Sequence, residues 1–163
     1  MLFRSGPDKN AIDVGFAATV DDMERALQVF NTALGFGLKM DKEEHNDARL
    51  RLIGNYTAYY SRAFGVVPGS NLQMELIEVQ GVGRRLGKSR PQDPGTALLR
   101  LRVSDLDLAI RTLEGKQVPV VSTGGVPVTL AGANGSQRFA MMRLPDNLFL
   151  QLVQAVPRPP AAN

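Results

Sequence analysis

The chain repeats one plan twice, and this repeat limits the folds that are open to it. In the first half, an apolar segment ends at Val20 and is followed by a run in which apolar side chains recur at three- and four-residue steps, as on one face of a helix. The second half does the same after Val103, so the halves are offset by 83 residues (103 − 20). The same offset relates four further apolar positions: Met23 to Leu106, Ala26 to Ala109, Leu27 to Ile110 and Phe30 to Leu113. The sequence therefore predicts two modules of one design.

Both predicted helices have recognisable ends. Each begins at a capping box, in which a side chain before the helix accepts a hydrogen bond from a backbone N–H of the first turn. Each stops at a glycine, the residue that most often ends a helix in the left-handed conformation. The capping pairs are Asp21 with Glu24 and Ser104 with Asp107, and the glycines are Gly35 and Gly115.

Strand-like runs surround the two helices. They cover 13–20, 38–40, 48–53, 56–62 and 72–77 in the first half, and 96–103, 118–121, 126–130, 137–143 and 148–153 in the second. The closing strands 72–77 and 148–153 are offset by 76 (148 − 72), so the second half is the shorter between helix and last strand. The predicted fold class is α+β, with two tandem βαβββ modules at about 12–80 and 95–156 in one domain, 1–156. Residues 81–94 are expected to be a linker and 157–163 a disordered tail.

Composition excludes several classes of protein. No apolar run approaches the roughly 18 residues that a membrane-spanning helix needs, and the first residues lack the apolar core of a secretory signal. The absence of cysteine excludes disulfides and zinc–thiolate sites. We therefore expect a cytoplasmic protein with no membrane partner.

The net charge of +3 raises the question of nucleic-acid binding. The densest basic stretch lies in the predicted linker and contains no aromatic residue on which a base could stack: Arg84, Arg85, Lys88 and Arg90. A solvated linker is the preferred interpretation, and no nucleic-acid partner is predicted. The mild positive charge also disfavours cationic ligands.

The two-module plan resembles the vicinal oxygen chelate superfamily, which includes glyoxalase I, bleomycin-resistance proteins and extradiol dioxygenases. The segments that carry the resemblance are VDDMERALQVFNTALGFGL (20–38), RVSDLDLAI (102–110) and RFAMMRLPDNLFLQLVQ (138–154). The resemblance implies a mixed sheet cupped around a central cavity, and it makes a homodimer a candidate assembly. It implies no single activity, because this scaffold hosts lyases, isomerases, dioxygenases and binding proteins.

In metal-dependent members of that superfamily, four inward-facing side chains, typically two His or Gln and two Glu, hold a divalent ion. The resemblance places them at one position in the first strand and one in the last strand of each half. The corresponding residues here are Gly15, Glu75, Leu98 and Gln151. Glycine and leucine have no side-chain donor, and the only histidine, His45, lies in a polar stretch between two predicted strands. We therefore predict no bound metal and no other cofactor.

Strand alternation predicts which other side chains line the cavity. Small residues at Gly15 and Ala17 leave room for a ligand, and Phe149 could stack on a planar one. Because a lone buried charge is costly, Arg100 is the predicted partner of Glu75, with Arg102 nearer the rim. The predicted ligand-binding residues are Gly15, Ala17, Gln73, Glu75, Leu98, Arg100, Arg102, Phe149, Gln151 and Tyr59.

The tyrosines Tyr56, Tyr59 and Tyr60 could wall this cavity, although ordinary strand packing is the preferred interpretation for any one of them.

The sequence leaves three functions open. The first is a protein that binds a small, mostly apolar or aromatic organic molecule in a metal-free cavity. The second is a metal-independent lyase, isomerase or cyclase, with Glu75 as the catalytic base and Arg100 as the stabiliser of a developing oxyanion. The third is a metal-dependent glyoxalase or dioxygenase, which the missing ligands disfavour.

Overall fold

The computed structural model describes residues 14–41, 47–52, 54, 58–81, 83, 87, 89–132, 135–146 and 148–156. The chain divides into two compact units, Met1–Val82 and Gly83–Asn163. The boundary lies inside the predicted linker 81–94, so each unit contains one of the predicted modules. Each module builds its own sheet.

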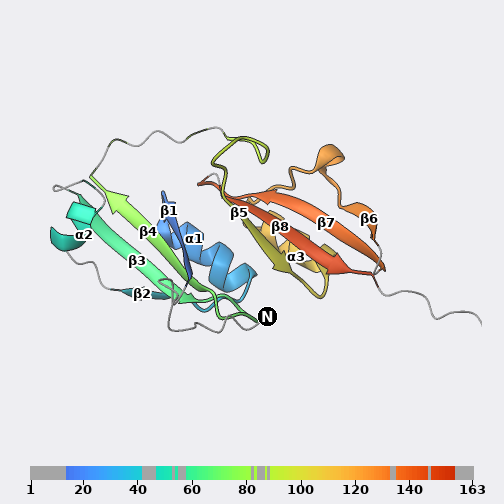
Figure 1. Cartoon of the computed structure of the whole chain (residues 1–163), viewed down its shortest axis with the longest axis horizontal. Helices are drawn as coiled ribbons and strands as arrows, with labels where there is room; N and C mark the ends of the chain where they lie inside the picture. Colours follow the sequence, from blue (N-terminus) through green and yellow to red (C-terminus); the bar gives the residue numbers. More distant parts are fainter. Residues whose placement is uncertain are drawn as a thin grey trace, which may run out of the picture. The chain divides into compact units, whose positions relative to one another are not determined.

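Module one, the unit Met1–Val82, is a four-stranded mixed sheet with a helix packed on one face (Figure 1). The helix α1 packs on β3 and β4. The strand order is β1-β4-β3-β2, in which β1 and β4 run parallel and the other pairs antiparallel. The elements are β1 (Gly15–Val20), α1 (Met23–Leu27), β2 (Lys39–Asp41), α2 (Asp47–Leu52), β3 (Tyr59–Val66) and β4 (Gln73–Gln80).

Module two, the unit Gly83–Asn163, has the same plan (Figure 1). Its strand order is β5-β8-β7-β6, again with a parallel first pair, and α3 packs on β7 and β8. The prediction of an α+β fold with two βαβββ modules is confirmed. The elements are β5 (Leu98–Arg102), α3 (Leu106–Glu114), a 3₁₀ turn (Thr123–Gly125), β6 (Val128–Gly132), β7 (Gly135–Arg143) and β8 (Phe149–Ala155).

The strand registers confirm the duplication residue by residue. Gly15 pairs with Gln73 in module one, and Leu98 pairs with Phe149 in module two. The offsets are 83 (98 − 15) for the first strands and 76 (149 − 73) for the last strands, as the sequence predicts. Each first-strand and last-strand position of module one therefore has one counterpart in module two.

The helices α1 and α3 begin at aspartates that obey the same offset. The carboxylate of Asp22 accepts from the backbone N–H of Arg25 at 3.0 Å, and that of Asp105 accepts from the N–H of Leu108 at 2.9 Å. The caps predicted one position earlier in each half are wrong. An N-cap residue has extended backbone, and Asp22 (φ −141°) and Asp105 (φ −131°) have that conformation directly before the first helical residue.

The first helix does not stay α-helical to its end. It continues into a π-helical turn (Gln28–Ala33), in which the N–H of Leu34 bonds to the carbonyl of Val29, five residues earlier, at 3.1 Å. Val29 and Phe30 of this turn are both buried. Gly35 follows with a φ of 72°, which confirms the predicted left-handed end. In module two Gly115 follows the helix as predicted, but the left-handed residue is Gln117 (φ 61°).

Two predicted strands are wrong. Residues 48–53 belong mostly to helix α2, because Ala, Arg and Leu are strong helix formers and a helix suffices to bury Leu50 while Leu52 stays exposed. Residues 118–121 make only an isolated bridge between Val120 and Met142.

Each module has an apolar layer between its helix and its sheet. In module two, Leu106 and Leu113 of α3 are fully buried, as are Leu150 and Leu152 of β8. Within the described ranges, no helix is long and apolar enough to cross a bilayer.

Truncation of Leu113, which is 0% exposed, is expected to destabilise the chain. Leu113→Ala should lower the free energy of unfolding by about 2–5 kcal/mol, because it removes buried methyl groups and leaves a cavity. The same substitution at Leu108, which is 54% exposed on the same helix, should change it by less than about 0.5 kcal/mol. Urea unfolding of both variants checks this, and equal losses would contradict the placement of the helix.

Candidate functional site

The face of the module-one sheet that does not carry α1, here called the module-one face, holds the predicted site residues of this half. The register and the alternation of side chains place Gly15, Ala17, Gln73 and Glu75 on it. Gly15 and Ala17 are exposed, so this part of the sheet is open. Strand β3 adds Tyr60, Arg62 and Phe64 to the same face.

Glu75 is held by two side chains of the neighbouring strand β3. The Arg62 guanidinium donates from Nη1 to Glu75 Oε1 at 3.3 Å, and the Tyr60 hydroxyl donates to the same oxygen at 3.3 Å. The cation and the phenol therefore both bind one oxygen of the carboxylate that occupies the closing-strand position of the module.

Arg62 also binds a second carboxylate on its other side. Its Nε and Nη2 donate to Asp41 Oδ2 at 2.9 and 2.6 Å, and the guanidinium lies over the Phe64 ring at 4.9 Å. The hydrogen bond to Asp41, reinforced by Glu75 and opposed by burial, raises the pKa of Arg62 above its ordinary value. A permanently charged, oriented guanidinium therefore lies between two carboxylates on the module-one face.

The face of the module-two sheet that does not carry α3, here called the module-two face, holds the other predicted site residues. Leu98, Arg100 and Arg102 alternate along β5 with their side chains exposed. The Nε of Arg100 donates to Oε1 of Gln151, its cross-strand neighbour, at 2.5 Å. Arg102 lies opposite Val153. Glu75 and Arg100 thus each have a partner inside their own module, and a pair between them stays a prediction.

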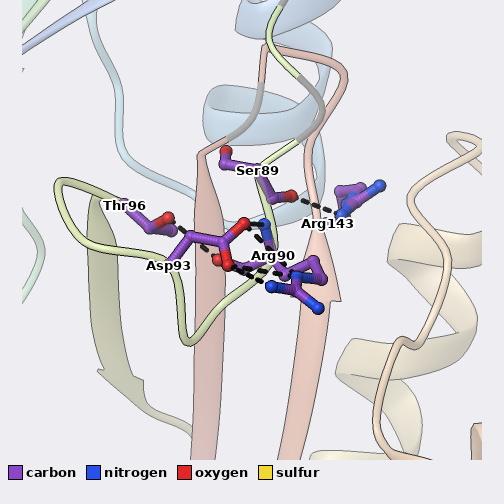
Figure 2. Close-up of polar contacts among 5 residues, drawn as sticks. All are labelled: Ser89, Arg90, Asp93, Thr96 and Arg143. Carbon is purple, nitrogen blue, oxygen red and sulfur yellow. Dashed lines mark hydrogen bonds and ion pairs between the residues drawn. The ribbon is translucent and has the colours of Figure 1, made fainter.

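Phe149 is already covered by an arginine. The ring is fully buried, and the Arg143 guanidinium lies over it at 5.1 Å. Arg143 Nη2 donates to the backbone carbonyl of Ser89 at 2.6 Å (Figure 2), which ties this end of the module-two face to the linker. A planar ligand that stacks on Phe149 would have to share the ring with Arg143.

The later part of the predicted linker is ordered by its own contacts. The Arg90 guanidinium donates from Nε and Nη2 to Asp93 Oδ1 at 3.0 and 2.8 Å, and the Arg90 backbone N–H donates to Asp93 Oδ2 at 2.8 Å. The Thr96 hydroxyl donates to the carbonyl of Arg90 at 2.9 Å (Figure 2). The hydrogen bond from the Arg90 side chain holds the pKa of Asp93 below its usual value. Arg90 is thus engaged by a carboxylate, whereas Arg84, Arg85 and Lys88 lie outside the described residues.

Tyr59 is a correction to the predicted site. It pairs with Gln80 and lies on the face of the sheet that carries α1, opposite to Glu75. Its neighbour Tyr60 takes the predicted place and binds Glu75 directly. Tyr56 and His45 lie outside the described residues.

Sequence reasoning missed Arg62 and Asp41 as members of the site, and it named Tyr60 only as one of three tyrosines that could wall the cavity. All three lie on the middle and edge strands of module one, whose register with β4 cannot be counted from the repeat. The signal that was present is the alternation of Tyr60, Arg62 and Phe64, which puts a phenol, a guanidinium and a ring on one face.

The residues at the superfamily's metal positions do not fit a divalent ion. Gly15 and Leu98 have no donor, Glu75 accepts from Arg62 and Tyr60, and Gln151 accepts from Arg100. A guanidinium on each remaining acceptor repels a cation and already binds Oε1 of that side chain. Among the described residues, no three His, Cys, Asp or Glu side chains cluster as metal ligands.

A surface pocket of about 620 Å³ lies on the other side of the module-one sheet. It is lined by α1, the π-helical turn and strand residues such as Ser61 and Glu78. One of its carboxylates, Asp22, caps α1. This pocket is therefore separate from Gly15, Ala17, Gln73 and Glu75, which lie on the opposite face of this sheet.

Comparison with known proteins agrees with the two-module architecture. The Glyoxalase/Bleomycin resistance protein/Dioxygenase superfamily profile matches residues 14–131, well over half of the chain. The chain belongs to this superfamily. The matched range ends before the β7–β8 hairpin, which completes the second module. A search of curated proteins found no match.

Solved structures of superfamily proteins share the fold. A glyoxalase family protein from Bacillus cereus is similar over 94% of this chain and 100% of its own, with a TM-score of 0.74 at 14% identity. A glyoxalase/bleomycin resistance protein from Albidiferax ferrireducens is similar over 88% and 99%, with a TM-score of 0.54 at 15% identity. At such low identity these superfamily relatives support the fold alone.

Removal of the Arg62 guanidinium is expected to destabilise module one. Arg62→Met leaves Asp41 and Glu75 without their cation, and it should lower the free energy of unfolding by roughly 1–2 kcal/mol, since the cluster is partly exposed. A double-mutant cycle with Asp41→Asn in urea should show coupling between the two side chains. Arg51→Met, on the exposed surface of α2, is the control and should be near neutral. Additive losses at Arg62 and Asp41 would contradict the pairing.

Proposed function

We propose that this superfamily member binds small, mostly apolar or aromatic organic molecules on the sheet faces opposite α1 and α3, without a metal. The observation that carries the proposal is the pairing of both remaining polar ligand positions with arginines, Glu75 with Arg62 and Gln151 with Arg100. At the scaffold positions that hold a metal in other members, the two polar side chains are therefore bound by arginines instead. What these faces offer a ligand is room, apolar surface and fixed polar anchors.

The composition of the faces supports an organic ligand. Gly15 and Ala17 leave open sheet, and a Cβ at Gly15 would meet only ordinary contacts, 3.7 Å from Gln73. Phe64 (41% exposed) and Leu98 (45% exposed) present apolar surface beside the charged groups. Apolar walls with a few oriented polar groups are typical of small-molecule sites.

A bulky side chain on the module-one face should block the proposed ligand site. We expect the purified chain to bind 2-naphthol, a neutral aromatic probe, saturably and equally well before and after treatment with EDTA. Ala17→Trp should weaken that binding at least about tenfold, because the indole fills the open part of the face. Leu108→Trp, which adds the same ring to an exposed position on α3, should leave it unchanged.

Fluorescence titration measures 2-naphthol binding by the wild type, Ala17→Trp and Leu108→Trp. Loss of probe binding after EDTA would contradict a metal-free site, and equal binding by Ala17→Trp would show that the ligand lies elsewhere.

A metal-independent lyase, isomerase or cyclase is the second candidate function. The observation that favours it is the orientation of the Glu75 carboxylate, whose Oε1 accepts hydrogen bonds from the Tyr60 phenol and the Arg62 guanidinium. Its other oxygen, Oε2, is left to accept a proton from a substrate.

Glu75→Gln separates the two candidates once a turned-over compound is known. An enzyme loses turnover and keeps ligand affinity within a few fold, because the amide retains the shape of the carboxylate but cannot take a proton. Turnover that persists in Glu75→Gln removes Glu75 as the base. Phe64→Leu, a neighbour on the same face, controls for packing effects.

A further inference from the structure

The module-two face carries positive charge that no described acid of its own module balances. Arg100 and Arg102 on β5 and Arg143 on β7 all belong to this face. Of the carboxylates described in module two, none forms an ion pair with any of the three. The structural arginine on the opposite face of the same sheet, Arg138, does have an acid, Asp107, at 2.7 Å.

Comparison with module one shows that the acids are missing from specific positions. Asp41 lies opposite Arg62, and the equivalent pair in module two is Val128 opposite Phe139. Glu75 corresponds to Gln151 by the offset of 76 (151 − 75), so both carboxylates of module one have neutral counterparts.

Conversely, Ala17 corresponds to Arg100 and Thr19 to Arg102, by the offset of 83 (100 − 17). Module two has cations where module one has small residues, and no acids where module one has two.

The arginines on β5 are arranged to accept a second partner. Arg100 uses Nε for Gln151, which fixes the plane of the guanidinium and leaves its Nη1 and Nη2 edge for two parallel hydrogen bonds to an anion. Arg102 lies two residues further along the same strand and side, with its Cα roughly 6.6 Å away. Both side chains are exposed.

The rest of the face is suited to an apolar body. Phe139 and Met141 of β7 are half-buried, and Val153 lies between Arg102 and Phe139 in the register. Phe149 is fully buried under Arg143, so it offers no platform for stacked nucleic-acid bases. The face therefore favours a small organic anion over a nucleic-acid strand.

We propose that the module-two face binds an aromatic or apolar carboxylate, anchored by Arg100 and Arg102. This inference rests on the proposed function and names its ligand class. The carboxylate supplies the negative charge that the face lacks, while Phe139 and Met141 contact the apolar body.

Two probes of nearly equal shape test the ligand class. Naphthalene-2-carboxylate and its neutral analogue naphthalene-2-carboxamide are titrated into the full chain by calorimetry. We expect the carboxylate to bind about tenfold more tightly or better, the preference expected of charge-assisted hydrogen bonds. The preference should fall to within a few fold in Arg100→Gln and Arg102→Gln and shrink with added salt. Arg111→Gln, on exposed α3, should retain it.

The possible results separate the failure of this inference from that of the proposed function. Equal binding of the two probes would overturn the anionic ligand class and leave the organic-ligand function standing. An anion preference that survives in the Arg100→Gln, Arg102→Gln double variant would overturn the assignment to these arginines. Binding of neither probe would count against both proposals, and thermal unfolding of each variant confirms that it is folded.

Discussion

The parallel ladder between the first and last strand of each module is the constraint on which the rest depends. It sets Gly15 beside Gln73 and Leu98 beside Phe149, and from those two pairs every other facing position follows by alternation. Because the ladder is the same in both modules, the strand register identifies the four residues at the positions that hold a metal elsewhere in the superfamily. The side chains at these four positions then determine the chemistry of the chain.

Arginines bind the two polar side chains that stand at those positions, Glu75 and Gln151. In module one, Arg62 pairs with both Glu75 and Asp41 within a single cluster, which therefore has one more acid than base. In module two, Arg100 binds the neutral Gln151 and keeps its charge uncompensated by any described acid of that module. The duplicated frame thus presents an acid-rich ion-pair cluster on the module-one face and a cationic, apolar surface on the module-two face. This asymmetry is what makes an anionic organic ligand the better fit for module two.

Much of the fold could be predicted because constant offsets in residue number align equivalent positions of the two halves. The offset of 83 located both helices and both first strands, and the caps missed by one residue in each half because Asp21 and Asp22, or Ser104 and Asp105, are both good capping residues in sequence. The strand predicted at 48–53 failed because a short apolar run fits a helix equally well. The site was half predictable: Glu75, Gln151 and Arg100 come from strands that the repeat aligns, whereas Tyr60 and Arg62 depend on the register of β3.

The claim that side-chain cations replace the metal is tested most directly by titrating the chain with Ni²⁺ or Mn²⁺ in a calorimeter. The structure predicts no saturable binding in the micromolar range for the wild type, because Glu75 and Gln151 accept from Arg62 and Arg100 while Gly15 and Leu98 have no donor. Glu75→Gln should then leave the titration unchanged. A stoichiometric micromolar complex that is lost in Glu75→Gln would contradict the account, since it would show that Glu75 is a metal ligand.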